Sequence, residues 1–562
     1  MNAERLLTLY EKIADAPDAI PRLRRFVLDL AVRGKLVPQD PSEEPASELL
    51  KQIAAEKARL VKAGKIRKPK TRPAVDEAPF GVPNAWRWTR IREITSDRGQ
   101  IVPDAKFTYI DVTAIDKEKG IVAEPKVLSA SEAPSRARKI TRKGDVIYSC
   151  VRPYLLNVAV IEEDFEPAPI ASTAFAILDG YGLVLPHYLW IVLRSPFMVE
   201  CVEANMRGQA YPAINDADFA VLPFPIPPLA EQHRIVAKVD ELMALCDRLE
   251  AARQTREATR DRLTAASLAR LNAPDPDTFR DDARFALDAL PALTARADQI
   301  RQLRQTILNL AVRGKLAPQD PKDEPASELL SRIAAEFERL VRDGVLNKPK
   351  PVKAITDDDQ LFPLPPQWAL ARFNQVASIQ SNLVDPKRYK EMPHIAPDNI
   401  EGWTARLLPY VSIGEAGVFS GKHLFSAGAI LYSKIRPNLA KVTKIDFDGL
   451  CSADMYPIHA LIDADFLVKF MITPAFVSQA VSEDNRVAMP KINQAALSDI
   501  FVPVPPAAEQ HRIVAKVDEL LALCDRLEAS LAADDETRRL LFKALLAEAF
   551  APADARELEA AE

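Results

Sequence analysis

The sequence is poor in cysteine and in long apolar runs. Its 562 residues include five cysteines and no Cys-x-x-Cys pair, which indicates neither a disulfide framework nor a zinc site. No apolar run reaches the roughly 18 residues that a membrane-spanning helix needs. The amino-terminal segment carries acidic residues and lacks the apolar core of a signal peptide. We therefore expect a soluble, cytoplasmic protein.

The motifs of several enzyme classes are also missing. There is no P-loop, no Gly-x-Gly-x-x-Gly, no His-Glu-x-x-His and no Pro-Pro tetrapeptide of an amino-methyltransferase. Asp104 with Glu124 and Lys126 has the letter pattern of a metal-dependent nuclease. That loose pattern arises often by chance, and the second half of the chain keeps no equivalent. We expect a non-catalytic chain without a metal or cofactor of its own, and keep a self-sufficient nuclease as an alternative.

The charge balance excludes a generally basic surface. The formal net charge is -5, which argues against a non-specific nucleic-acid binder. Residues 79–228 hold 16 basic and 18 acidic side chains, and residues 361–506 hold 13 of each. Any contact with a nucleic acid must therefore come from local patches.

The strongest positive feature is an internal duplication. The string EQHRIVAKVDEL occurs at Glu231–Leu242 and again at Glu509–Leu520, each time after a Pro-Pro pair and before ALCDRLEA. LAVRGKL occurs at Leu30–Leu36 and at Leu310–Leu316. The repeat period of about 280 residues is far longer than that of solenoid repeats, so the chain is a duplicated half-molecule.

Each EQHRIVAKVDEL string opens a predicted long helix. Apolar residues recur at heptad spacing, and proline precedes a first turn that contains glutamate. Each helix is expected to run for about 40 residues, roughly 60 Å, and to pack against the other copy as an antiparallel coiled coil. The predicted seam comprises Ile235, Val239, Leu242, Cys246, Leu249, Ile513, Val517, Leu520, Cys524 and Leu527.

The predicted fold class is α+β, with two mixed α/β domains joined by the two long antiparallel coiled-coil helices in a pseudo-two-fold duplication. Short β-like runs between turn residues replace the helical periodicity in the two globular regions. The expected segments are an amino-terminal helical segment 1–78, a first globular domain 79–228, a central long helix 229–272, a linker with the repeated helical segment 273–360, a second globular domain 361–506, and a final long helix 507–562.

The globular domains share only an outline, whereas the helices are nearly identical. Tyr148-Ser149 and Arg152-Pro153 correspond to Tyr432-Ser433 and Arg436-Pro437. The tetrapeptides PAIN and PKIN, at 212–215 and 490–493, also correspond. Two copies of one frame with two different inserts indicate one scaffold that presents two different readers.

Together these features resemble the specificity subunit of type I restriction–modification enzymes. The resemblance rests on the EQHRIVAKVDEL helix after Pro-Pro, on LAVRGKL, and on HIAPDNIEGW at His394–Trp403, and it covers nearly the whole chain. It implies two target-recognition domains that each read one half of a split DNA site, with helices that set the gap. It also implies two methyltransferase subunits that carry S-adenosylmethionine and, where the system has them, two restriction subunits that use ATP and Mg. The first recognition domain has no counterpart of HIAPDNIEGW.

Candidate DNA-binding residues lie in both globular domains. Arg, Asn and Gln side chains read purine edges in the major groove. Arg152 and Arg436, which the two domains share, are better suited to phosphate or framework contacts than to specificity. The candidates are Arg136, Arg138, Lys139, Arg142, Lys143, Arg152, Tyr154, Arg207, Gln209, Tyr211, Lys387, Arg388, His394, Asn399, Lys434, Arg436, Asn438, Arg486 and Lys491.

A second class of function remains open. A duplicated coiled-coil scaffold can equally serve as an adaptor whose globular domains bind protein. The adaptor predicts no salt-dependent DNA binding, and the nuclease predicts metal-dependent cleavage by the chain alone.

Overall fold

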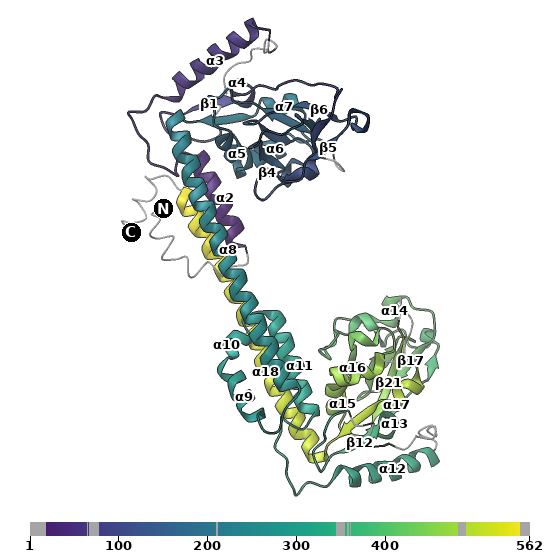
Figure 1. Ribbon diagram of the computed structural model, residues 1–562. Coiled ribbons are helices and arrows are strands. Elements are labelled where there is room, and N and C mark those ends of the chain that lie inside the picture. Colours follow the sequence, from purple (N-terminus) through teal and green to yellow (C-terminus); the bar gives the residue numbers. More distant parts are fainter. Residues whose placement is uncertain are drawn as a thin grey trace. The chain divides into compact units, whose positions relative to one another are not determined.

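The computed structural model describes residues 18–64, 66, 78–208, 212–343, 355–356, 359, 361–481 and 490–550. The chain divides into two compact units, residues 1–255 with 537–562 and residues 256–536. Each unit contains one mixed α/β domain and part of a helical frame (Figure 1). Within the described ranges no single helix is long and apolar enough to cross a membrane. One bent pair, α15 (Ala464–Met471) and α16 (Pro474–Val481), passes the test on length and composition.

Two long helices form the frame. Helix α8 (Leu229–Asn272) and helix α18 (Ala507–Phe550) each have 44 residues, which corresponds to about 66 Å. Helix α8 begins in the first unit and ends in the second, whereas α18 begins in the second and ends in the first. The two helices therefore run antiparallel, and the expected fold class is confirmed.

A short helix packs on the first half of each long helix. In the first unit, Arg24 of α2 (Ala19–Val32) reaches Asp247 at 2.6 Å and Glu250 at 3.1 Å on α8. The second unit repeats the same contacts at the same two distances, between α11 (Ala297–Val312) and α18, through Arg304, Asp525 and Glu528. The duplication of the sequence is thus a duplication of individual ion pairs.

The predicted seam is apolar and largely buried, and part of it packs on helices that the sequence did not predict. Ile235 and Val239 belong to a core that contains Val27 and Leu28 of α2 together with the first globular domain. Buried residues of α18 join the matching core with α11 and the second domain, namely Ile513, Val517 and Cys524. Cys246 is also buried, and Leu242, Leu249, Leu520 and Leu527 are partly buried. The sequence suggested the other long helix as the partner of the seam. It did not predict the short helices α2 and α11, which pack on part of each seam.

Each globular domain joins the frame through a two-stranded neck. In the first domain β1 (Arg87–Arg90) pairs antiparallel with β11 (Pro223–Ile226), and in the second β12 (Ala369–Arg372) pairs with β22 (Phe501–Val504). The chain therefore enters and leaves each domain at one place. Helices α3 (Ala46–Lys62) and α12 (Ala326–Arg342) begin beside the necks, where Ala46 N donates to Ala85 O and Ala326 N to Gln367 O, both at 2.9 Å.

The first domain is built on two sheets. One has the strand order β10-β7-β8-β4-β3 and the other β5-β2-β9-β6. The strands are β2 (Phe107–Ile110), β3 (Ile115–Asp116), β4 (Ile121–Val122), β5 (Lys126–Leu128), β6 (Ala137–Ile140), β7 (Val146–Ser149), β8 (Val158–Val160), β9 (Pro169–Ser172) and β10 (Phe175–Leu178). The helices are α4 (Ile91–Ile94), α5 (Pro186–Arg194), α6 (Pro196–Glu203) and α7 (Asp216–Ala220).

The second domain repeats this plan with different lengths. Its sheets have the orders β13-β21-β18-β19 and β14-β17-β20-β15-β16. The strands are β13 (Ala377–Ile379), β14 (Leu383–Val384), β15 (Pro393–Ile395), β16 (Val411–Ser412), β17 (Lys422–Phe425), β18 (Ile430–Ser433), β19 (Val442–Lys444), β20 (Gly449–Cys451) and β21 (Met455–Ala460). The helices are α13 (Phe373–Val376), α14 (Ile413–Ala416), α15 (Ala464–Met471), α16 (Pro474–Val481) and α17 (Gln494–Asp499).

A buried glutamate fixes the start of each long helix to its neck. Trp86 Nε1 donates to Glu231 at 2.9 Å, and Gln39 Nε2 donates to the same carboxylate at 2.6 Å. Burial raises the pKa of Glu231, and the two hydrogen bonds oppose that rise. Glu509 makes the same pair of contacts with Trp368 and Gln319. In each unit this buried carboxylate therefore links the start of the long helix to the residues just before the neck.

Removal of either glutamate is expected to destabilise its own unit. In Glu231→Ala and Glu509→Ala the buried indole N–H loses its acceptor, which costs about 1–3 kcal/mol per site. Urea unfolding of each variant measures the loss. Glu231→Gln retains an acceptor oxygen and serves as the matched control. Equal stability of Glu231→Ala and the wild type would show that water replaces the carboxylate.

Candidate nucleic-acid interface

The shared arginines occupy the same strained loop in both domains. Arg152 follows β7 with φ 48°, and Arg436 follows β18 with φ 49°. Left-handed conformations are costly for non-glycine residues and persist only where the surroundings enforce them. A serine hydroxyl braces each loop, because Ser149 Oγ donates to Val151 O at 2.9 Å and Ser433 Oγ to Ile435 O at 3.0 Å.

The shared tetrapeptides hold these arginine loops in place. Arg152 N donates to Pro212 O at 2.9 Å, and Arg436 N donates to Pro490 O at 2.8 Å. The asparagine that ends each tetrapeptide, Asn215 or Asn493, caps the following helix, α7 or α17. The sequence signal that the domains share thus identifies a framework that presents a loop. Tyr154 and Asn438, in the short 3-10 turns after the arginines, are exposed.

Four of the basic candidates in the first domain face solvent. Arg136, Arg142 and Lys143 are exposed, and Lys143 Nζ lies 3.7 Å from Asp164. Arg138 is partly exposed, and its guanidinium donates to Ala137 O at 2.8 Å. Arg207 is exposed beside Asp218, at 3.1 Å. Of the basic patch predicted near β6, Arg136, Arg138, Arg142 and Lys143 are therefore at least partly exposed.

The prediction that Lys139 binds DNA is wrong. Its side chain is buried, and the ammonium group lies 2.8 Å from Asp97 and 2.9 Å from Asp216. Burial lowers the pKa of Lys139, but the hydrogen bonds to the two carboxylates outweigh burial and raise it. The lysine ties β6 to the start of α7, so it is a structural ion pair and not a phosphate ligand. Its neighbours in the sequence gave no sign of this burial.

The basic candidates of the second domain form two groups. Lys387 and Arg388 are exposed in a 3-10 turn that follows β14. Lys434 and Lys491 lie around Asp454, because Lys434 N donates to Asp454 O at 3.0 Å and Lys491 Nζ lies 3.4 Å from its carboxylate. The second group adjoins the loop of Arg436 through the shared tetrapeptide at 490–493. That end of the domain therefore gathers Lys434, Arg436, Asn438 and Lys491.

The fold engages two of the candidate residues in HIAPDNIEGW. His394 is buried on β15. Burial, and to a smaller extent the positive charge of the nearby Lys422, lowers the pKa of its imidazole, which is therefore neutral at pH 7. Asn399 accepts from Ala396 N at 2.8 Å and donates to Pro409 O at 2.7 Å. His394 is thus enclosed by the fold, whereas Asn399 is half-buried and its amide is engaged by the turn. The motif covers most of strand β15 and the 3-10 turn that follows it.

Three candidates, Gln209, Tyr211 and Arg486, lie outside the described residues. Sequence reasoning missed Phe419, Ile101 and Val102, which are 79%, 45% and 65% exposed. An isolated apolar residue gives no sign of exposure until its neighbours in space are known. Among the described residues no group of three His, Cys, Asp or Glu could hold a metal ion.

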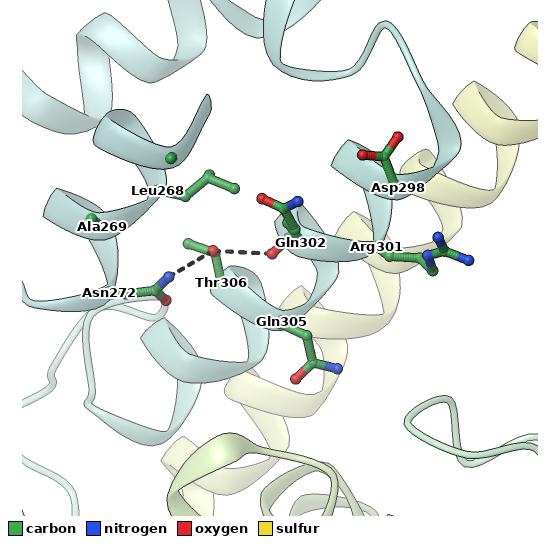
Figure 2. Close-up of a pocket in the computed structure, with 9 residues that line it drawn as sticks. Leu268, Ala269, Asn272, Asp298, Arg301, Gln302, Gln305 and Thr306 are labelled. Carbon is green, nitrogen blue, oxygen red and sulfur yellow. Dashed lines mark hydrogen bonds between the residues drawn. The ribbon is translucent and has the colours of Figure 1, made fainter. Parts of the chain in front are cut away.

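A groove in the frame of the second unit lies away from these loops. It has a volume of 560 Å³ between the end of α8 and α11, with lining residues that include Leu268, Asn272, Arg301 and Gln305 (Figure 2). Asn272 donates to Thr306 Oγ1 at 3.1 Å across it. The groove therefore belongs to the helix packing and not to the candidate interface.

Comparisons with known proteins identify the family of the chain. The model of the family described as type I restriction modification DNA specificity domain matches residues 140–259 and 367–533. The chain is 30% identical to the type I restriction enzyme EcoAI specificity subunit of Escherichia coli, over 94% of this chain and 93% of the relative. It is 28% identical to the EcoEI specificity subunit of the same organism, with the same coverage. A solved structure, reported for complex assembly and conformational transition of the type I R-M system, has 23% identity and a TM-score of 0.51 over 84% of this chain and 99% of that one.

Proposed function

Because this chain belongs to the family of type I restriction–modification specificity subunits, we propose that each of its two domains reads one half of a bipartite DNA target and that the frame sets the distance between the halves. The observation that carries this proposal is a repetition. The two-stranded neck and the tryptophan–glutamate hydrogen bond beside it recur in both units, while the exposed residues of the two domains differ. Glu231 and Glu509 hold the two domains in the same way, whereas the exposed residues above them differ.

The duplicated frame also supports the proposed partners. Arg24 joins α2 to α8 and Arg304 joins α11 to α18 through matching ion pairs. Each unit therefore has an equivalent pair of packed helices whose outer surface could bind a partner. Such surfaces suit two copies of one methyltransferase subunit, which would carry S-adenosylmethionine, and two restriction subunits where the system has them. This chain then contributes recognition, and the partner subunits contribute the chemistry and the ATP and Mg that it uses.

The arginine loops suit the sequence-independent part of DNA binding. A residue shared by two readers of different sequences cannot distinguish those sequences, but it can contact phosphate. The exposed Arg436 projects from a braced loop beside Lys434 and Lys491. Each phosphate contact releases condensed counterions, so its loss lowers affinity and the salt dependence together.

Arg436→Gln tests this proposal against the adaptor alternative. We expect weaker binding to every target sequence, with the slope of log K against log salt reduced by about 0.9 and no change in the bases preferred. Titration of the methyltransferase complex on specific and scrambled duplexes measures both quantities. Arg332→Gln, a change at an exposed position of helix α12, is the matched control. Salt-independent association of the wild-type complex with DNA would favour the adaptor.

A further inference from the structure

Phe419 is the most exposed aromatic residue among the described residues of the second domain, and the proposed function leaves it unexplained. It lies in the loop between α14 and β17 and is 79% exposed, more than the 54% of Phe285 on helix α9 (Phe279–Asp288). Burial of a phenylalanine side chain is worth about 1.5–3 kcal/mol. A domain with a well-packed core that leaves this side chain in water has a surface suited to a partner.

The loop that carries Phe419 is held at both ends. Gly417, with φ 59°, ends α14, and α14 is itself fixed by the reciprocal capping of Ser412 and Glu415. On the other side, Lys422 Nζ donates to Ser420 Oγ at 2.7 Å and to Ser420 O at 3.0 Å. The phenyl ring is therefore presented by a preorganised loop, which lowers the entropic cost of binding.

Cations border this apolar projection. Gly421 packs beside Leu383 of the edge strand β14, since a methyl group on its Cα would lie 3.7 Å from Leu383 Cβ. Leu383 is 61% exposed, and Lys387 and Arg388 follow four and five residues later without an ion pair among the described residues. The acidic neighbours are engaged locally, because Asp385 accepts from Lys387 N and Glu415 accepts from Ser412 N. An apolar tip with free cations beside it complements a groove lined by phosphates.

The first domain exposes apolar side chains at the equivalent edge of its sheet. Its strands β6, β9 and β2 pair as β17, β20 and β15 do, with one antiparallel and one parallel partner for the central strand. The segment beside β6, bridged through Gln100 and Lys139, takes the place of β14 and exposes Ile101 and Val102. The equivalent edge of each domain thus projects apolar side chains, and the side chains differ between the two readers.

We propose that Phe419 determines specificity in the second domain by contacting the 5-methyl group of a thymine in the major groove. This inference rests on the DNA-reading function proposed above. The thymine methyl is the one apolar group on the major-groove edge of the base pairs, and phenylalanine is a side chain suited to it. The cations Lys387 and Arg388 then lie where the flanking phosphates run.

Replacement of single thymines by deoxyuridine tests the contact. In the methyltransferase complex, each thymine of the half-site read by the second domain is replaced in turn, which removes only the methyl group. For the wild type we expect about a fourfold loss of affinity at one position, the value of one buried methyl group. Phe419→Ala should bind the thymine duplex more weakly and lose nothing further at that position, whereas Phe419→Leu should keep part of the sensitivity.

The controls separate this inference from the function on which it rests. Phe285→Ala, an equally large truncation of an exposed side chain in the frame, should retain the wild-type response to deoxyuridine. A wild-type complex without a bipartite target contradicts the proposed function itself. A bipartite target whose second half has no A·T pair, or an unchanged deoxyuridine response in Phe419→Ala, overturns the role of Phe419. A uniform loss of affinity for all duplexes in Phe419→Ala would make the ring a wedge between bases and also overturn it.

Discussion

Exchange of residues 91–222 for the corresponding part of another specificity subunit is expected to replace one half of the DNA target completely. The other half and the spacer should stay unchanged. The exchange leaves both neck strands, β1 and β11, and the anchor of Trp86 on Glu231 in place, so the graft enters a preserved frame. Sequencing of the methylated positions reads both halves in one experiment.

The reciprocal exchange of residues 373–500 is the matched control for this prediction. It should change only the opposite half, because β12 and β22 form an equivalent neck. Specificity differences of this kind correspond to many base pairs, each worth about 1–3 kcal/mol. A graft in either domain that altered both half-sites would contradict independent readers.

A four-residue insertion in the long helices is expected to lengthen the spacer and leave the bases unchanged. Four residues add about 6 Å and slightly more than one helical turn, so the apolar face stays nearly in register. On DNA this rise corresponds to about two base pairs. The insertion belongs between Thr255 and Arg256 of α8 and between Glu536 and Thr537 of α18, where each helix passes from one compact unit to the other.

Two-residue insertions at the same points are the control for the helix prediction. They rotate the following half of each helix by about 200° and should abolish methylation. The four-residue variant should methylate the original half-sites at the greater distance. New half-site bases in that variant would refute the role of the helices as spacers, and an unchanged spacer would show that the distance is set elsewhere.

The frame could be predicted from the sequence because its signals are periodic and repeated. The heptad spacing, the Pro-Pro exits and the identical strings at Glu231 and Glu509 all indicate the same two helices. Their short-helix partners were not predicted, because periodicity shows which face is buried and not what covers it. The matched contacts of Arg24 and Arg304 appear only in the folded chain.

The recognition surface could be predicted only in part. Residue type identified Arg136 and Arg436 as solvent-facing cations, but it also selected Lys139, which the fold buries between Asp97 and Asp216. Charge indicates what a side chain can bind, and burial decides what it does bind. Phe419 shows the converse, since an apolar residue normally belongs to a core and its exposure depends on how the loop before β17 is held.

The positions methylated by the complex of this chain with its methyltransferase subunit test the central claim most directly. The account predicts one bipartite motif, with two specific half-sites separated by a non-specific gap of constant length. Each half-site should be assignable to one domain. A single continuous recognition sequence, or half-sites at variable distances, would contradict two readers held on a rigid frame.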